Sequence, residues 1–121
     1  MKNIIVIEDD TDINNIITKA LEKAGYNCTQ AFSGTEALIY LERENYDLAV
    51  MDLMLPGISG EELLPKIKTL QKIPVMVVSS KDSLDSKVGL LTDGAEDYIT
   101  KPFEIQELVA RAGVQIRRFS E

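Results

Sequence analysis

Five short strand-like segments alternate with five amphipathic segments along the chain. The strand-like segments cover residues 4–7, 26–31, 48–51, 75–78 and 98–100. The first, third and fourth are continuous apolar runs, which are typical of strands buried on both faces inside a parallel sheet. Between the strands, apolar residues recur at helical spacing and predict helices over about residues 13–24, 33–41, 59–67, 84–91 and 104–117.

Turn and capping residues mark the ends of these helices. Gly25 follows the last apolar residue of the first helix, where a glycine often ends a helix. Ser33 with Glu36, and Ser59 with Glu62, have the spacing of capping boxes at the start of the second and third helices. The pattern therefore predicts five consecutive strand–helix units without an internal linker.

Repeated strand–helix units imply a parallel sheet, because parallel strands need a crossover connection and a helix is the usual one. The predicted fold class is α/β, a doubly wound (βα)5 sheet of five parallel strands with helices on both faces. The chain has 121 residues, the length of one ordinary domain. We expect residues 1–121 to form a single domain.

Composition excludes several functions for this chain. The net charge is −7, so the domain should repel phosphate backbones and not bind nucleic acid directly. The chain has no histidine, which excludes histidine-based catalysis and a phosphohistidine donor role. Its one cysteine, Cys28, cannot form an intrachain disulfide, which fits a reducing cytoplasm. No apolar run approaches the roughly 18 residues needed to span a bilayer, so we expect no membrane segment.

Polar residues follow the predicted strands at the edge where open parallel sheets bind ligands. Acids follow the first and third strands, hydroxyls end the fourth, and a lysine follows the fifth. In chain order these residues are Glu8-Asp9-Asp10, Asp52, Ser79-Ser80 and Thr100-Lys101-Pro102. The carboxyl ends of parallel strands meet at one edge, so we expect these side chains to converge.

Converging carboxylates repel one another, and a hard divalent cation relieves that repulsion. Ligands that are all oxygens suit magnesium, whereas no EF-hand loop for calcium is present. Each residue alone also has an ordinary structural explanation. The acids at 8–10 could be helix caps, Asp52 a turn acid, Ser79 a turn hydroxyl and Lys101 a solvated lysine. Their coincidence at one edge favours a site.

The chain resembles response-regulator receiver domains of bacterial two-component signalling over essentially its whole length. Three segments carry the resemblance: Ile-Val-Ile-Glu-Asp-Asp at 5–10, Asp-Leu-Ala-Val-Met-Asp-Leu-Met-Leu-Pro-Gly at 47–57, and Gly-Ala-Glu-Asp-Tyr-Ile-Thr-Lys-Pro-Phe at 94–103. It is most similar to the winged-helix (OmpR/PhoB-type) transcriptional regulators. The resemblance implies a flavodoxin-like receiver fold with strand order 2-1-3-4-5.

The resemblance also implies a role for each residue of the edge. Asp52 is the phosphoacceptor in a regulatory domain that is not an enzyme beyond its own phosphotransfer and dephosphorylation. Mg²⁺ is the implied cofactor, and its ligands are Glu8, Asp9, Asp52 and the backbone carbonyl of Met54. Lys101 and Ser79 contact the phosphoryl group, Ser79 and Tyr98 form the switch, and Lys101-Pro102 is a cis-peptide site.

The implied partners are a sensor histidine kinase and, after phosphorylation, a second copy of the chain. Pairing would use the segments 84–91, 98–100 and 104–117, with ion pairs from Lys87, Asp97, Glu107 and Arg111. In the full-length protein a C-terminal DNA-binding domain would follow and control transcription. Gly113 and Gly89 depart from the subfamily pattern and leave the dimer geometry open.

Three rival functions remain to be weighed. A haloacid-dehalogenase-type phosphatase also uses an aspartate and magnesium, but it needs a second acid where this chain has Met54. A flavodoxin-like electron carrier needs a first loop that accepts a flavin phosphate, which the acids at 8–10 would repel. A degenerate receiver would act only as a binding module, yet no acceptor, acid or lysine is missing here.

Overall fold

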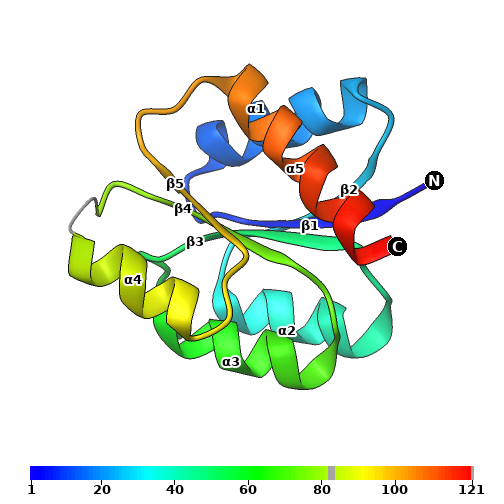
Figure 1. The fold of residues 1–121 in the computed structure, drawn as a ribbon. Coiled ribbons are helices and arrows are strands. Elements are labelled where there is room, and N and C mark those ends of the chain that lie inside the picture. Colours follow the sequence, from blue (N-terminus) through cyan, green and yellow to red (C-terminus); the bar gives the residue numbers. More distant parts are fainter. Residues whose placement is uncertain (82–83, 121) are drawn as a thin grey trace.

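A computed structural model describes residues 1–81 and 84–120, which form a central sheet covered by helices on both sides (Figure 1). The strands are β1 (Asn3–Ile7), β2 (Asn27–Ala31), β3 (Leu48–Asp52), β4 (Val75–Ser79) and β5 (Asp97–Thr100). The helices are α1 (Thr11–Lys23), α2 (Gly34–Arg43), α3 (Gly60–Leu70), α4 (Leu84–Thr92) and α5 (Ile105–Ser120). All ten elements agree in type and order with the sequence prediction, although α5 continues beyond its predicted end.

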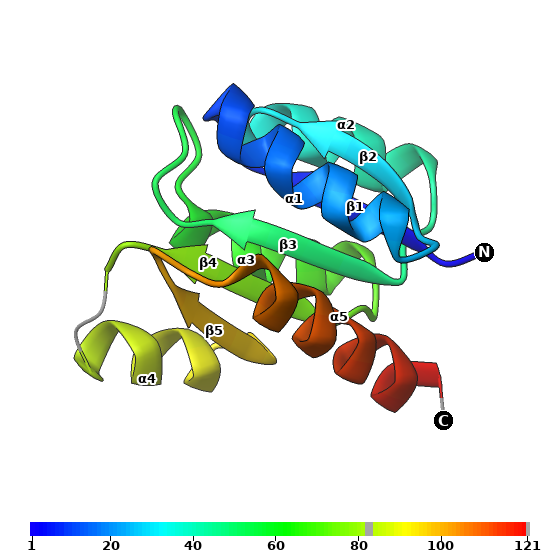
Figure 2. The same cartoon turned by 90° about the horizontal axis from the view of Figure 1, so that it is seen from above.

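The strand order and direction confirm the predicted fold class. All five strands are parallel, and their spatial order is β2-β1-β3-β4-β5. Figure 2 shows the sheet with α1 and α5 on the side facing the viewer. The polar loop predicted ahead of α4 includes residues 82–83, which lie outside the described residues. Within the described ranges, no helix is long and apolar enough to cross a lipid bilayer.

The sheet is buried on both faces, which explains the continuous apolar runs. Successive residues of β1 point to opposite faces: Ile4 and Val6 pack under α1 and α5, whereas Ile5 and Ile7 pack against the helices of the other side. All four are fully buried. Two separate apolar layers therefore hold the strands rigidly, and the polar residues that follow the strands project from a fixed edge.

Each of the first three helices begins at a residue whose side chain caps it. Asp10 Oδ1 accepts from the N–H of Ile13 at 3.0 Å. Ser33 Oγ accepts from the N–H of Glu36 at 3.1 Å, and Ser59 caps α3 in the same way. The caps satisfy N–H groups that a helix leaves without partners in its first turn. The capping signals in the sequence thus mark true helix starts.

The segment that follows Asp52 is held by a close approach of α3. A Cβ atom added at Gly60 would lie 2.6 Å from Leu53 Cα and 2.7 Å from Asp52 O. Both are backbone atoms, so they cannot turn away as a flexible side chain could. The N–H of Gly60 also donates to the carbonyl of Leu53 at 2.8 Å. Glycine at this position lets the start of α3 lie directly against the end of β3.

Candidate phosphorylation and metal site

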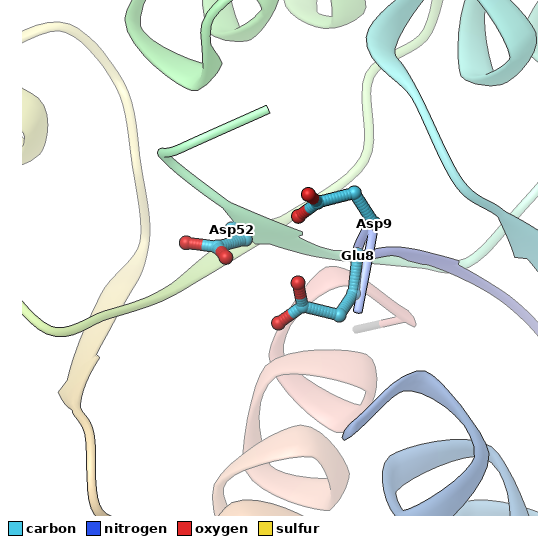
Figure 3. A group of neighbouring side chains, drawn as sticks. All are labelled: Glu8, Asp9 and Asp52. Carbon is cyan, nitrogen blue, oxygen red and sulfur yellow. The ribbon is translucent and has the colours of Figure 1, made fainter. Parts of the chain in front are cut away.

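Three carboxylates meet where β1 and β3 end. Glu8 and Asp9 lie in the short connection between β1 and α1, and Asp52 is the last residue of β3. One oxygen from each carboxylate lies within 4.8 Å of the others (Figure 3). Glu8 and Asp52 are buried, whereas Asp9 is exposed. The Asp10 side chain caps α1, so the capping interpretation of the acidic run holds for Asp10 alone.

Lys101 bridges the two buried carboxylates. Its Nζ donates to Glu8 Oε1 at 2.7 Å and to Asp52 Oδ2 at 3.1 Å. The backbone N–H of Lys101 donates to the carbonyl of Ser79 at 2.7 Å, which ties the end of β5 to the end of β4. The peptide bond between Lys101 and Pro102 is cis. The lysine predicted from the strand ends is thus inside the cluster.

Burial and charge set the protonation of this cluster. Burial raises the pKa of Glu8 to about 7, and the hydrogen bonds from Lys101 and from the N–H of Asp10 oppose this, while the charge of Asp52 adds to it. For Lys101, burial acts to lower the pKa, but the hydrogen bonds to Glu8 and Asp52 outweigh it and raise the pKa above its ordinary value. The lysine therefore stays charged, yet it does not fully compensate the buried acids.

A donor set of three carboxylates suits a hard divalent cation. Such a cation would stabilise the ionised form of Glu8, which burial otherwise disfavours. The cluster thus has oxygen ligands that suit a metal ion, and an excess of negative charge that the ion would neutralise.

Ser79 and Tyr98 are joined through the backbone of Lys81. Ser79 is fully buried at the end of β4, and its Oγ accepts from the N–H of Lys81 at 3.1 Å. The Tyr98 hydroxyl donates to the carbonyl of Lys81. The Lys81 side chain pairs with Glu61 at the start of α3, at 3.1 Å. Sequence reasoning did not select Lys81, because the only sign of its role was its position two residues after Ser79.

Met54 and the predicted dimer-face residues are the remaining residues that the sequence predicted to be functional. The Met54 side chain is exposed, and its N–H donates to Asp52 Oδ1 at 3.3 Å. Arg111 pairs within the chain with Asp97 at 2.8 Å and with Glu107 at 3.2 Å. Lys87 Nζ lies 5.8 Å from the centre of the Tyr98 ring. All four dimer-face residues therefore already have partners in their own chain, three through ion pairs and Lys87 through the Tyr98 ring.

Comparison with known protein families identifies the family of this chain. The sequence model of the response regulator receiver domain matches residues 4–113. The chain is a response-regulator receiver domain. Its relatives are regulators of the OmpR/PhoB type, in agreement with the resemblance seen in the sequence. Membership makes the domain a regulatory phosphoacceptor, not a conventional enzyme.

Individual relatives agree with this assignment. Regulatory protein VanRc of Enterococcus gallinarum is 39% identical over 118 residues, which cover 98% of this chain and 51% of the relative. The receiver domain of Francisella response regulator 1452 superimposes with a TM-score of 0.92 at 37% identity, covering 98% of this chain and 99% of that one. Other curated relatives are named as transcriptional regulatory proteins. The chain spans about half the length of the curated relatives it matches.

One related structure contains a modified site. A response regulator protein from Burkholderia pseudomallei, solved with a phosphorylated aspartic acid, calcium ion and citrate, has a TM-score of 0.85 to this chain at 28% identity. The match covers 98% of this chain and 73% of that one.

The pKa of Glu8 predicts how the stability of the metal-free receiver depends on pH. The folded carboxyl holds its proton up to about pH 7, whereas the unfolded one loses it near 4.5. The free energy of unfolding should therefore decrease as the pH rises through this window, by a few kcal/mol at most. Denaturant unfolding in EDTA at several pH values measures the slope.

The matched variants are Glu8→Gln and, at an exposed position of α2, Glu42→Gln. Glu8→Gln should flatten the profile between these pH values, and Glu42→Gln should leave it as in the wild type. Superimposable profiles for the wild type and Glu8→Gln would contradict the assignment.

Proposed function

We propose that this receiver accepts a phosphoryl group on Asp52 from a sensor histidine kinase, with Mg²⁺ bound at the acidic edge of the sheet. The observation that carries the proposal is the convergence of Glu8, Asp9 and Asp52, with Lys101 in contact with two of them. The phosphorylated aspartic acid and calcium ion of the Burkholderia relative support the same chemistry. The transfer would take place in the cytoplasm, where the kinase partner presents its phosphohistidine.

The magnesium ligands in this proposal are Glu8, Asp9, Asp52 and the backbone carbonyl of Met54. Bound magnesium supplies positive charge that screens the phosphoryl oxygens from the carboxylates. The chain itself positions the acids. The rigid ends of β1 and β3 fix Glu8 and Asp52, and the exposed Asp9 leaves the site open to an incoming donor.

In the transfer step, an oxygen of the Asp52 carboxylate forms a bond to phosphorus while the phosphorus–nitrogen bond of the donor's phosphohistidine breaks. The electron pair of the broken bond stays on the histidine nitrogen. A carboxylate is a weak nucleophile, so its placement and the compensation of charge matter more than a general base. Lys101 already donates to Asp52 Oδ2, so its ammonium can transfer that hydrogen bond to a phosphoryl oxygen.

Ser79 and Tyr98 would pass the modification to the output surface. The Ser79 hydroxyl would donate to the new phosphoryl group, which draws this residue toward Asp52. The backbone of Lys81 is hydrogen-bonded to both the Ser79 hydroxyl and the Tyr98 hydroxyl. A shift of Ser79 would therefore move the carbonyl that accepts from Tyr98. The result is a population shift between two arrangements of one fold.

The output is a homodimer through α4, β5 and α5. An apolar row on α4 supports this surface: Leu84, Val88 and Leu91 lie about one turn apart and are 74%, 52% and 47% exposed. Apolar residues grouped in this way on one face favour association with another protein surface. Intermolecular ion pairs would require Arg111 to exchange its present partners within the chain.

Residues 1–121 would form the receiver part of a longer regulator whose C-terminal domain binds DNA. The curated relatives are about twice as long as this chain, and several are named as transcriptional regulators. The receiver itself carries a net charge of −7, so contact with DNA would be left to the other domain.

Acetyl phosphate with magnesium should add one phosphoryl group to the wild-type chain, measured as a mass increase of the intact protein. Asp52→Asn should gain none, because the amide cannot attack phosphorus. Asp10→Asn is the matched control, since it removes a nearby charge and asparagine still caps α1. Phosphorylation of Asp52→Asn, or an unmodified wild type, would contradict the proposal.

Dimerisation has a separate test in sedimentation. Beryllofluoride with magnesium should shift the receiver from monomer to dimer, and Val88→Asp should prevent the shift because it places a charge in the apolar row of α4. Ile39→Asp, at an exposed apolar position of α2, should still dimerise. A wild type that stays monomeric, or equal loss in both variants, would count against this surface.

A further inference from the structure

Asn14 occupies a position where its residue type is unfavourable. It lies inside α1, and its side chain is fully buried beneath the sheet edge. Asparagine has low helix propensity, and it is seldom buried unless its amide is fully hydrogen-bonded. Asn14 is the fourth residue of α1, and a buried residue whose type does not favour its position commonly marks a site with another requirement.

The Asn14 amide nitrogen contacts the carbonyls at the ends of β1 and β2. Nδ2 lies 3.0 Å from Glu8 O, 3.2 Å from Ala31 O and 3.3 Å from Val6 O. Ile7 and Ala31 are the last pair in register between these strands, so the carbonyl of Glu8 lies beyond the ladder. A buried carbonyl without a donor is costly, and Asn14 supplies the donor.

Two further hydrogen bonds fix the orientation of this amide. Asn14 Oδ1 accepts from Thr18 Oγ1 at 3.0 Å and from Gln30 Nε2 at 2.9 Å. Gln30 Nε2 also donates to Asn15 Oδ1 at 2.8 Å, which holds the glutamine in place. With both donors on the oxygen, the nitrogen of Asn14 must face the strand ends.

We propose that Asn14 is a positioning residue for the acidic site. By holding the carbonyl of Glu8, it sets the direction in which the chain leaves β1, and the Glu8 and Asp9 side chains project from this stretch toward Asp52. Asn14 acts through the backbone and touches neither a metal ion nor a phosphoryl group. This inference rests on the proposed magnesium-dependent phosphorylation. It adds a residue from α1 to a site otherwise built from strand ends.

The experiment compares Asn14→Leu and Gln30→Leu with Ile17→Val. Asn14→Leu keeps the approximate shape and removes the amide. Gln30→Leu leaves Asn14 in place but removes one of the two hydrogen bonds that orient its amide. Ile17→Val weakens the packing of the same helix without touching the strand-end carbonyls. Magnesium affinity is measured from backbone amide shifts in NMR titrations, well below the melting temperature of each variant, and the phosphorylation rate is measured at saturating magnesium.

Asn14→Leu should weaken magnesium binding about tenfold, as is usual when a side chain that holds a metal ligand in place is removed. Gln30→Leu should weaken it less, in the same direction. At saturating magnesium both variants should recover most of the phosphorylation rate. Recovery would show that the metal ligands were misplaced and that the acceptor Asp52 was still functional. Ile17→Val should melt earlier with unchanged magnesium affinity.

Wild-type magnesium affinity in both Asn14→Leu and Gln30→Leu would overturn the inference and leave Asn14 a purely structural role. If Asn14→Leu does not fold, Gln30→Leu against Ile17→Val decides alone. A wild type that neither binds magnesium nor accepts phosphate would instead refute the proposed function, and the inference with it.

Discussion

The ammonium of Lys101 between Glu8 and Asp52 is the interaction on which the site depends. Two buried carboxylates so close together would repel each other strongly and would take up protons. One lysine that contacts both makes the arrangement tolerable, but it leaves the pKa of Glu8 raised to about 7. This incomplete compensation is what a switch needs. A fully neutralised cluster would have little affinity for a cation, and an uncompensated one would not fold as it does.

The sheet order makes this contact possible. Residues 8 and 101 are 93 positions apart in sequence, and two strands lie between the strands they follow. The long, flexible side chain of Lys101 spans that distance, and the hydrogen bond from the N–H of Lys101 to Ser79 keeps its backbone at the sheet edge.

Residues at the same sheet edge argue against the rival functions. Met54 replaces the second acid of a haloacid-dehalogenase-type phosphatase, and Glu8 and Asp9 would repel a flavin phosphate.

Much of this architecture could be predicted from local patterns. Apolar runs such as residues 75–78 and the caps at Ser33 and Ser59 depend on neighbours in sequence, so they identify strands and helix starts directly. The strand order could not be obtained in this way and came from the family resemblance. The acidic run at 8–10 was ambiguous for the same reason, since only the fold separates the capping Asp10 from the two acids that face Asp52.

Most of the supporting contacts could not be predicted from local sequence patterns. The hydrogen bonds of Lys81 to Ser79 and Tyr98, and those of Asn14 to the strand ends, join segments that only the folded chain brings together. The pairing of Arg111 with Asp97 likewise depends on how α5 packs beside β5, whereas its pairing with Glu107, four residues earlier in the same helix, is local. Residue types identified the chemistry of the site, while its supporting contacts depended on the tertiary fold.

A crystal structure of the receiver grown with magnesium and beryllofluoride would test the account most directly. We expect a beryllofluoride group on Asp52, a cation held by Glu8, Asp9, Asp52 and the backbone carbonyl of Met54, and a hydrogen bond from Lys101 to a fluorine. A cation bound by acids elsewhere on the molecule, or an Asp52 without beryllofluoride while Lys101 stays between the carboxylates, would contradict it.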